Sequence, residues 1–130
     1  MGLPFKILVA DDEEGWRELL SRWLKDAGYE LRVVSKGLDV LVLAKDFHPD
    51  CFILDHDLGD TTGFNVCTGL KAHPEYKTLP VVLLTANVDL MPKIANNCPA
   101  DLFVSKSDNP DELLLVLGTL APKLDDKAPK

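Results

Sequence analysis

The sequence lacks long hydrophobic runs, an excess of basic residues and an even set of cysteines. No apolar run approaches the roughly 20 residues of a membrane-spanning helix, and the first residues do not show the charged and then apolar pattern of a secretion signal. Its 14 Lys and Arg against 21 Asp and Glu give a net charge of −7. Nucleic-acid surfaces are basic, so we expect neither a membrane nor a nucleic acid as a partner.

The three cysteines, Cys51, Cys67 and Cys98, are widely spaced and set among apolar residues. This arrangement favours buried thiols in a reducing compartment over disulfides or a zinc site, and so predicts a cytoplasmic protein. With 46 % hydrophobic and 27 % charged residues, the 130 residues have the composition of one ordinary globular domain. We predict a domain at residues 5–122 and a polar tail at 123–130.

Short apolar runs alternate along the chain with stretches of helical character. The predicted strands are 5–10, 30–34, 51–55, 81–85 and 101–105. The predicted helices are 14–27, 38–47, 64–72, 89–97 and one that opens at Asn109, Pro110 and Asp111. Repeated strand–helix alternation with right-handed crossovers predicts an α/β fold, a doubly wound five-stranded parallel sheet with five helices.

Two of the predicted helices carry further information. In 14–27 the apolar residues form one stripe at helical spacing, and Gly28 is well placed to end the helix. In the last helix, 113–117 reads Leu-Leu-Leu-Val-Leu, which is apolar nearly all round. That helix is therefore either a partner or homodimer surface or a helix buried on two sides.

Polar side chains stand where the predicted strands end, and the carboxyl ends of parallel strands share the edge at which ligands bind. These residues are Asp11, Asp12, Asp55, Thr85 and Lys106. Carboxylates about 4 Å apart in a partly desolvated site repel by a few kcal/mol, unless a cation lies between them or one is protonated. Folding does not require that cost, so the cluster indicates a divalent cation and an anion that the cation carries.

The residue types at this edge suit phosphoryl transfer. Mg²⁺ prefers carboxylate, water and phosphate oxygens, so Asp12 and Asp55 are candidates to bind it directly, with Asp11 helping through water. The Asp55 carboxylate can also act as a nucleophile toward phosphorus. A hydroxyl and an ammonium, Thr85 and Lys106, are of the right types to hold the remaining phosphoryl oxygens.

A charge change at this edge can reach the outer surface through Thr85 and Phe103. If the Thr85 hydroxyl moved inward to a phosphoryl oxygen, it would leave space behind it. Phe103 could then change rotamer and alter the outer surface, as a two-state element biased by a local charge event.

These residues resemble the receiver domain of bacterial two-component response regulators, whose fold is that of the chemotaxis regulator. The resemblance covers about residues 5–120 and depends on four motifs that occur in the same order. The motifs are Leu8-Val-Ala-Asp11-Asp12-Glu13, Phe52-Ile-Leu-Asp55 with Gly63 eight residues later, Pro80-Val-Val-Leu-Leu-Thr85-Ala86, and Ala100-Asp-Leu-Phe103-Val-Ser-Lys106.

The resemblance implies a flavodoxin-like sheet of order 2-1-3-4-5 and a phosphorylation-dependent signalling switch rather than a turnover enzyme. A sensor histidine kinase or a phosphotransfer protein would donate the phosphoryl group to Asp55, and a downstream protein would read the result. The Mg²⁺ ligands that the resemblance implies are Asp11, Asp12, Asp55 and the backbone carbonyl of Asp57. Its switch residues are Thr85 and Phe103, and its essential lysine is Lys106.

The chain departs from the family pattern in three places. Members follow the lysine with a proline whose peptide bond is cis, whereas Lys106 is followed here by Ser107, which leaves the isomer of that bond open. Gly59 and Asp60 stand where Pro and Gly are usual. Asp57 adds a charge beside the site, where it would either repel phosphoryl oxygens or position water.

Other functions stay open on the sequence alone. One is a pseudo-receiver that docks on partners without being phosphorylated. Another is a haloacid-dehalogenase-type phosphohydrolase, because Asp55-His-Asp57 resembles that family's Asp-x-Asp signature, although the signature normally lies on the first strand.

No output domain follows, so we expect output through protein contacts, from either a stand-alone protein or an excised domain. His56 is expected to be a surface or loop residue, not a metal ligand.

Overall fold

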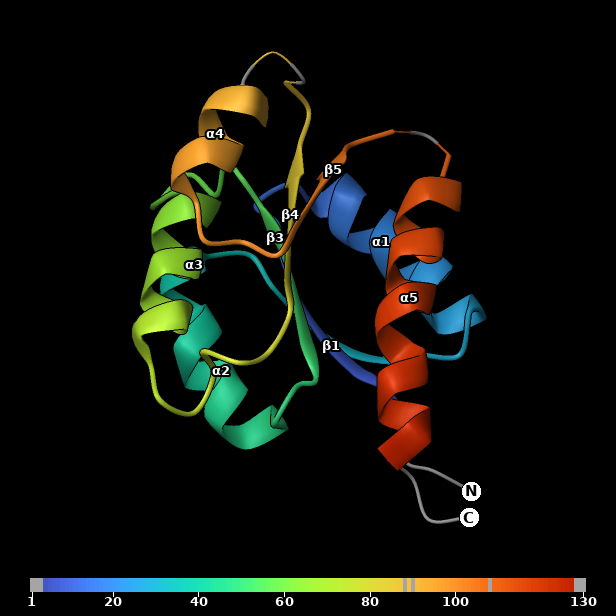
Figure 1. Ribbon diagram of the computed structural model, residues 1–130. Helices are drawn as coiled ribbons and strands as arrows, with labels where there is room; N and C mark the ends of the chain where they lie inside the picture. Colours follow the sequence, from blue (N-terminus) through green and yellow to red (C-terminus); the bar gives the residue numbers. More distant parts are fainter. Residues whose placement is uncertain (1–3, 88, 90, 108, 128–130) are drawn as a thin grey trace.

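The computed structural model describes residues 4–87, 89, 91–107 and 109–127. They form a sheet of order β2-β1-β3-β4-β5 in which every strand pairing is parallel, with helices on both faces (Figure 1). The sheet order and the parallel pairing confirm the predicted flavodoxin-like α/β fold.

The strands are short, and most of their residues are apolar. They are β1 (Lys6–Ala10), β2 (Glu30–Val34), β3 (Cys51–Asp55), β4 (Val81–Thr85) and β5 (Leu102–Ser105). Every residue of β3 and β4 is buried, as expected for central strands covered on both faces. The register pairs Ala10 with Leu54 and Thr85 with Ser105, so β1 and β3, and likewise β4 and β5, end at similar levels of the sheet.

One face of the sheet is covered by α1 (Glu14–Asp26) and α5 (Asp111–Lys127) (Figure 1). Leu20 and Leu24 of α1 and Leu113 and Leu117 of α5 pack in one buried cluster with alternate residues of the strands. Gly28, at φ 95°, follows the end of α1, which confirms the predicted stop.

The other face is covered by α2 (Val40–Phe47), α3 (Gly63–Ala72) and α4 (Met91–Asn97) (Figure 1). The second buried cluster lies beneath them and includes Leu8, Phe52 and Leu83 from the sheet and Cys67 from α3. Thr62 begins α3, since its side chain accepts the Asn65 N–H at 3.1 Å.

The predicted helix 38–47 is divided in the structure. A 3₁₀ turn, η1 (Gly37–Asp39), precedes α2. The Asp60 carboxylate accepts the N–H groups of Gly37 at 3.0 Å and Leu38 at 3.1 Å, and so fixes the start of this segment from a remote part of the chain. The same two hydrogen bonds lower the pKa of Asp60.

The last two helices also differ from their predicted limits. Helix α4 begins at Met91, two residues after the predicted start at 89, and Pro92 lies in its first turn, where the missing N–H is tolerated. The Asn109 side chain accepts the Asp111 N–H at 2.8 Å, which agrees with the predicted start of the last helix. Helix α5 continues to Lys127, into the predicted tail. The domain limits 5–122 and 123–130 stay a prediction.

Candidate functional site

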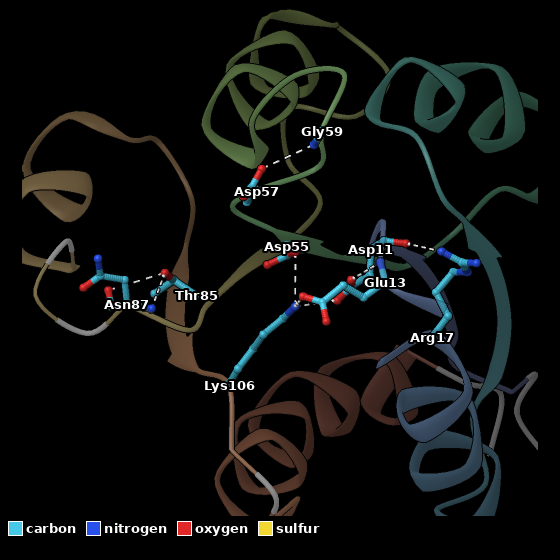
Figure 2. A network of polar contacts seen from close by, with 9 residues as sticks. All are labelled: Asp11, Glu13, Arg17, Asp55, Asp57, Gly59, Thr85, Asn87 and Lys106. Carbon is cyan, nitrogen blue, oxygen red and sulfur yellow. Dashed lines mark hydrogen bonds and ion pairs between the residues drawn. The ribbon is translucent and has the colours of Figure 1, made fainter. Parts of the chain in front are cut away.

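The polar residues that follow the strands lie together at the carboxyl edge of the sheet (Figure 2). Asp11 follows β1, Asp55 ends β3, Thr85 ends β4 and Lys106 follows β5. The backbone continues the sheet at this edge, because the Lys106 N–H donates to the Thr85 carbonyl at 2.8 Å. A rigid buried sheet therefore sets the relative positions of these side chains.

Three carboxylates form the centre of the site. Oxygens of Asp11, Asp12 and Asp55 lie within 4.8 Å of one another. Asp12 is exposed, whereas Asp11 is 0 % and Asp55 5 % exposed. Clustered carboxylate oxygens, partly shielded from water, are a ligand set that suits a hard divalent cation. Among the described residues, this is the group of acidic, His and Cys side chains close enough together to hold a metal ion.

Lys106 is the lysine that faces these carboxylates. Its Nζ lies 2.9 Å from Asp11 Oδ2, 3.2 Å from Asp55 Oδ2 and 3.9 Å from Glu13 Oε1, and its side chain is 3 % exposed (Figure 2). Arg17 contacts the backbone of the cluster and not its carboxylates, since its guanidinium donates to the Asp11 backbone carbonyl at 2.9 Å. One buried ammonium therefore balances more than one buried carboxylate.

The excess of carboxylate over ammonium shifts the pKa values of Asp55 and Lys106. Burial raises the pKa of Asp55 to about 6, the charge of Asp11 adds to the shift, and Lys106 opposes it. Burial also acts to lower the pKa of Lys106, but its contacts with Asp11 and Asp55 outweigh burial, so that pKa lies above its ordinary value. Lys106 therefore stays a cation, while an ionised Asp55 is costly unless further positive charge arrives.

The loop after Asp55 is held in a compact form. Asp57 forms an isolated bridge with Thr62 and its side chain accepts the Gly59 N–H at 3.3 Å. A Cβ at Gly63 would collide with the Asp55 carbonyl oxygen and the Leu83 side chain, so this position requires glycine. The loop thus packs directly on the backbone of Asp55.

Thr85 and Phe103 occupy different surroundings. Thr85 is 4 % exposed, and its Oγ1 accepts the Asn87 N–H at 3.1 Å (Figure 2). Phe103 pairs with Leu83 across β4 and β5 and packs, half-buried, against the cluster beneath α2, α3 and α4. The structure thus places Thr85 at the site and Phe103 in the adjoining core.

A cleft of about 410 Å³ opens onto this edge. It is lined by Glu13, Asp55, His56, Asp57, Thr62, Thr85, Ala86, Asn87 and Lys106. Its dimensions and its mixture of carboxylates, a hydroxyl and an ammonium suit a small anion that binds together with a cation.

The structure brings Asp11, Asp12, Asp55, Thr85 and Lys106 together, as predicted. The described residues contain no cis peptide bond, so the bond between Lys106 and Ser107 is trans. His56 lines the cleft and continues the sheet, since its N–H donates to the Leu84 carbonyl at 2.8 Å.

Sequence reasoning missed two side chains that contact the lysine or its partners. The Lys106 Nζ lies 5.0 Å from the centre of the Trp16 ring, over its face. Arg17 supports Asp11, as described above. Trp16 belongs to the apolar stripe of 14–27, which predicts core packing and gives no sign of a contact with Lys106. For the contact between Arg17 and Asp11, the only signal was an arginine about one helical turn after the acidic pair.

Comparison with known proteins gives the family. The response regulator receiver domain matches residues 7–117. The transcriptional regulatory protein GltR of Pseudomonas aeruginosa is 34 % identical over 109 residues, which cover 83 % of this chain and 45 % of GltR. The chain spans about half the length of the curated relatives it matches.

Solved structures agree with this result. A response regulator from Chloroflexus aurantiacus has a TM-score of 0.84 at 33 % identity, covering 91 % of this chain and 98 % of its own. The response regulator TrrA of Thermotoga maritima, in complex with Mg²⁺-BeF, has a TM-score of 0.81 at 32 % identity, covering 89 % and 98 %. The chain belongs to the response regulator receiver domain family, the signalling switches of two-component systems.

Family membership answers part of what the sequence left open. The match is to receiver domains, which are signalling switches, and no comparison supports the haloacid-dehalogenase alternative. Within the described ranges, no helix has the length and hydropathy needed to cross a bilayer.

Proposed function

We propose that Asp55 accepts a phosphoryl group from a sensor histidine kinase or a phosphotransfer protein. The observation that carries this proposal is an excess of carboxylate over ammonium. Oxygens of Asp11, Asp12 and Asp55 lie within 4.8 Å of one another, and Lys106 is the lysine that contacts Asp11 and Asp55. Membership of the receiver family supports the kinase as donor. In this role the chain acts as a switch and not as a turnover enzyme.

The cofactor we propose is Mg²⁺. Its ligands would be Asp11, Asp12, Asp55 and the backbone carbonyl of Asp57, with Asp11 able to act through water. Oxygen ligands in a charge-rich, partly open cluster suit this ion, and the related TrrA structure contains Mg²⁺-BeF. When bound, the ion would neutralise charge on the transferring group.

The chain's own residues have distinct proposed roles in the transfer. An Asp55 oxygen forms a bond to phosphorus as the bond from phosphorus to the donor's histidine nitrogen breaks, and the donor keeps that electron pair. Lys106, a cation 3.2 Å from Asp55 Oδ2, binds a phosphoryl oxygen. The Thr85 hydroxyl exchanges its contact with Asn87 for another phosphoryl oxygen, and Phe103 then moves in the adjoining core.

We propose that output passes through protein contacts in the cytoplasm. The three cysteines are free and buried, which supports a reducing compartment, and the net charge of −7 disfavours nucleic acid as a direct partner of this chain. On α5, Leu115 is 72 % exposed while Leu113 and Leu117 are buried. Leu115 therefore supports a partner or homodimer surface on this helix.

Intact-protein mass spectrometry after incubation with acetyl phosphate tests the proposal. We expect one phosphoryl adduct that requires Mg²⁺ and is lost in Asp55→Asn, while Asp57→Asn remains labelled. An adduct that persists in Asp55→Asn would move the acceptor elsewhere. No adduct in a folded wild type would favour a docking module, and continuous release of phosphate from a generic ester would favour a hydrolase.

A further inference from the structure

We propose that Trp16 is a positioning residue for Lys106. Its indole holds the Lys106 ammonium beside Asp55 while the charge of the neighbouring carboxylates changes. The inference extends the proposed function, since its consequence is a faster phosphoryl transfer. It assigns to a residue of the apolar stripe on α1 a role that neither the motifs nor the resemblance suggested.

The contact itself is a cation over an aromatic face. The Lys106 Nζ lies 5.0 Å from the centre of the Trp16 ring, within the range of cation–π attraction. Its other partners are the carboxylates of Asp11 at 2.9 Å and Asp55 at 3.2 Å. Because the Lys106 side chain is 3 % exposed, water screens this attraction only weakly.

The indole is a useful second partner for Lys106 because Asp11 and Asp55 are also the proposed metal ligands. Binding of a divalent cation by Asp11 and Asp55 would neutralise the same charges that attract the ammonium. Lysine has a flexible four-carbon side chain, so an ammonium held by carboxylates alone would be released as the metal binds. The indole face keeps its attraction whatever the carboxylates bind, and so keeps Lys106 beside the acceptor.

Other contacts orient the indole independently of Lys106. Trp16 packs edge-to-face on Trp23, with ring centres 6.3 Å apart and an interplanar angle of 76°. It lies half-buried against the core cluster that contains Leu20 and Val104. The ring is therefore a pre-formed platform for the ammonium.

Trp23 supplies a matched control. It lies on the same helix and touches the same ring, yet within the described part of the chain the Lys106 ammonium lies over Trp16 and makes no such contact with Trp23. Trp16→Phe keeps an aromatic face, while Trp16→Leu keeps most of the apolar volume of Phe without a ring. Comparing these two variants separates the aromatic contact from simple packing.

The experiment measures the labelling rate by acetyl phosphate at saturating Mg²⁺, the Mg²⁺ dissociation constant by calorimetry, and the NMR shift of the Lys106 methylene protons next to Nζ. We expect Trp16→Leu to label about fivefold to thirtyfold more slowly and Trp16→Phe about threefold or less. The dissociation constant should change less than about twofold. Trp23→Leu removes only a support of the Trp16 ring and not the contact with the ammonium, so it should slow labelling less than Trp16→Leu does. An upfield ring-current shift should be present in wild type and lost in Trp16→Leu.

Each contrary result has one meaning. Equal slowing in Trp16→Phe and Trp16→Leu would assign the effect to lost volume and overturn the role. Labelling of Trp16→Leu at the wild-type rate would overturn it as well, while leaving the proposed function intact. A wild type that takes no phosphoryl group overturns the proposed function itself. If Trp16→Leu does not fold, Trp16→Met takes its place as the variant without a ring.

Discussion

Lysine–carboxylate contacts occur at both edges of the sheet, and they differ in how their charges balance. At the amino-terminal edge, Lys71 Nζ lies 2.7 Å from Asp101 Oδ2 and donates to the Leu79 carbonyl at 2.8 Å. The same Asp101 oxygen accepts the Val81 N–H at 2.8 Å. One cation meets one anion, further hydrogen bonds tie the pair to the ends of the strands, and the Asp101 side chain is 45 % exposed.

At the carboxyl-terminal edge, the pairing is unequal and buried. Lys106 contacts Asp11 and Asp55, both of which are almost completely shielded from water. Burial raises the pKa of Asp55 to about 6, so this carboxylate is ionised at neutral pH at a cost in stability. The balanced pair of Lys71 and Asp101 stabilises the fold. The cluster around Lys106 keeps an excess of negative charge, which suits the binding of a cation.

Removal of each lysine in turn should give the largest difference between the two edges. We expect Lys106→Ala to slow labelling of Asp55 by about a hundredfold or more, because the phosphoryl oxygens lose a preorganised cation. Lys71→Ala should label at the wild-type rate and lose about 1 kcal/mol of stability with its hydrogen bonds. Mass spectrometry over time and thermal unfolding measure the two effects.

Mg²⁺ binding gives the control for the lysine variants. Calorimetry should show that Lys106→Ala still binds Mg²⁺, since the proposed ligands are all oxygens. Loss of Mg²⁺ binding in this variant would contradict the division of roles between the carboxylates and the lysine. Slow labelling in Lys71→Ala would contradict the assignment of the other edge to stability alone.

Neutralising one carboxylate at each edge should change stability in opposite directions. In EDTA at pH 7 we expect Asp55→Asn to be more stable than wild type by about 1–2 kcal/mol, after allowing for solvent screening. Asp101→Asn should be less stable by about 0.5–1 kcal/mol, because it loses the charge of a balanced pair. Denaturant unfolding at several pH values measures both changes.

The pH dependence of the first effect follows from the direction of the shift. Asp55 binds its proton more tightly in the folded protein, with a pKa of about 6 against 3.8 for the ordinary group. Wild-type stability should therefore fall as pH rises from about 4 to 6 and level off above. The advantage of Asp55→Asn should be full at pH 7 and vanish near pH 4, and a constant advantage would exclude this carboxylate as its cause.

The fold could be predicted from the chain because its elements have clear periods. Strands β3 and β4 are apolar up to their last residues, which indicates central strands, and the stripe on α1 indicates one buried helix face. The order of the strands came from the resemblance, since periodicity does not contain it. The division of 38–47 into η1 and α2 could not be predicted, because it depends on Asp60, which reaches Gly37 from a segment remote in sequence.

The site could be predicted where chemistry and strand ends coincide, as for Asp11, Asp55 and Lys106. Phe103 was predicted from its place near Thr85 and from the resemblance, and its movement stays a prediction. Trp16 was missed because a tryptophan in an apolar stripe at helical spacing has the same signal whether it fills the core or faces an ammonium at the edge of the core. Only the tertiary contact between α1 and the residue after β5 distinguishes these two cases.

The smallest expected effect is a change in the fluorescence of Trp16 when Mg²⁺ binds. The chain has two tryptophans, so Trp23→Phe leaves Trp16 as the reporter at the carboxyl-terminal edge. Mg²⁺ at the carboxylates would alter the field on an indole whose face lies over the Lys106 ammonium, and titration with Mg²⁺ should shift the emission with the dissociation constant found by calorimetry. An unchanged emission despite Mg²⁺ binding would separate Trp16 from the charge at this edge, and Ca²⁺ at equal ionic strength shows whether the response depends on ion size.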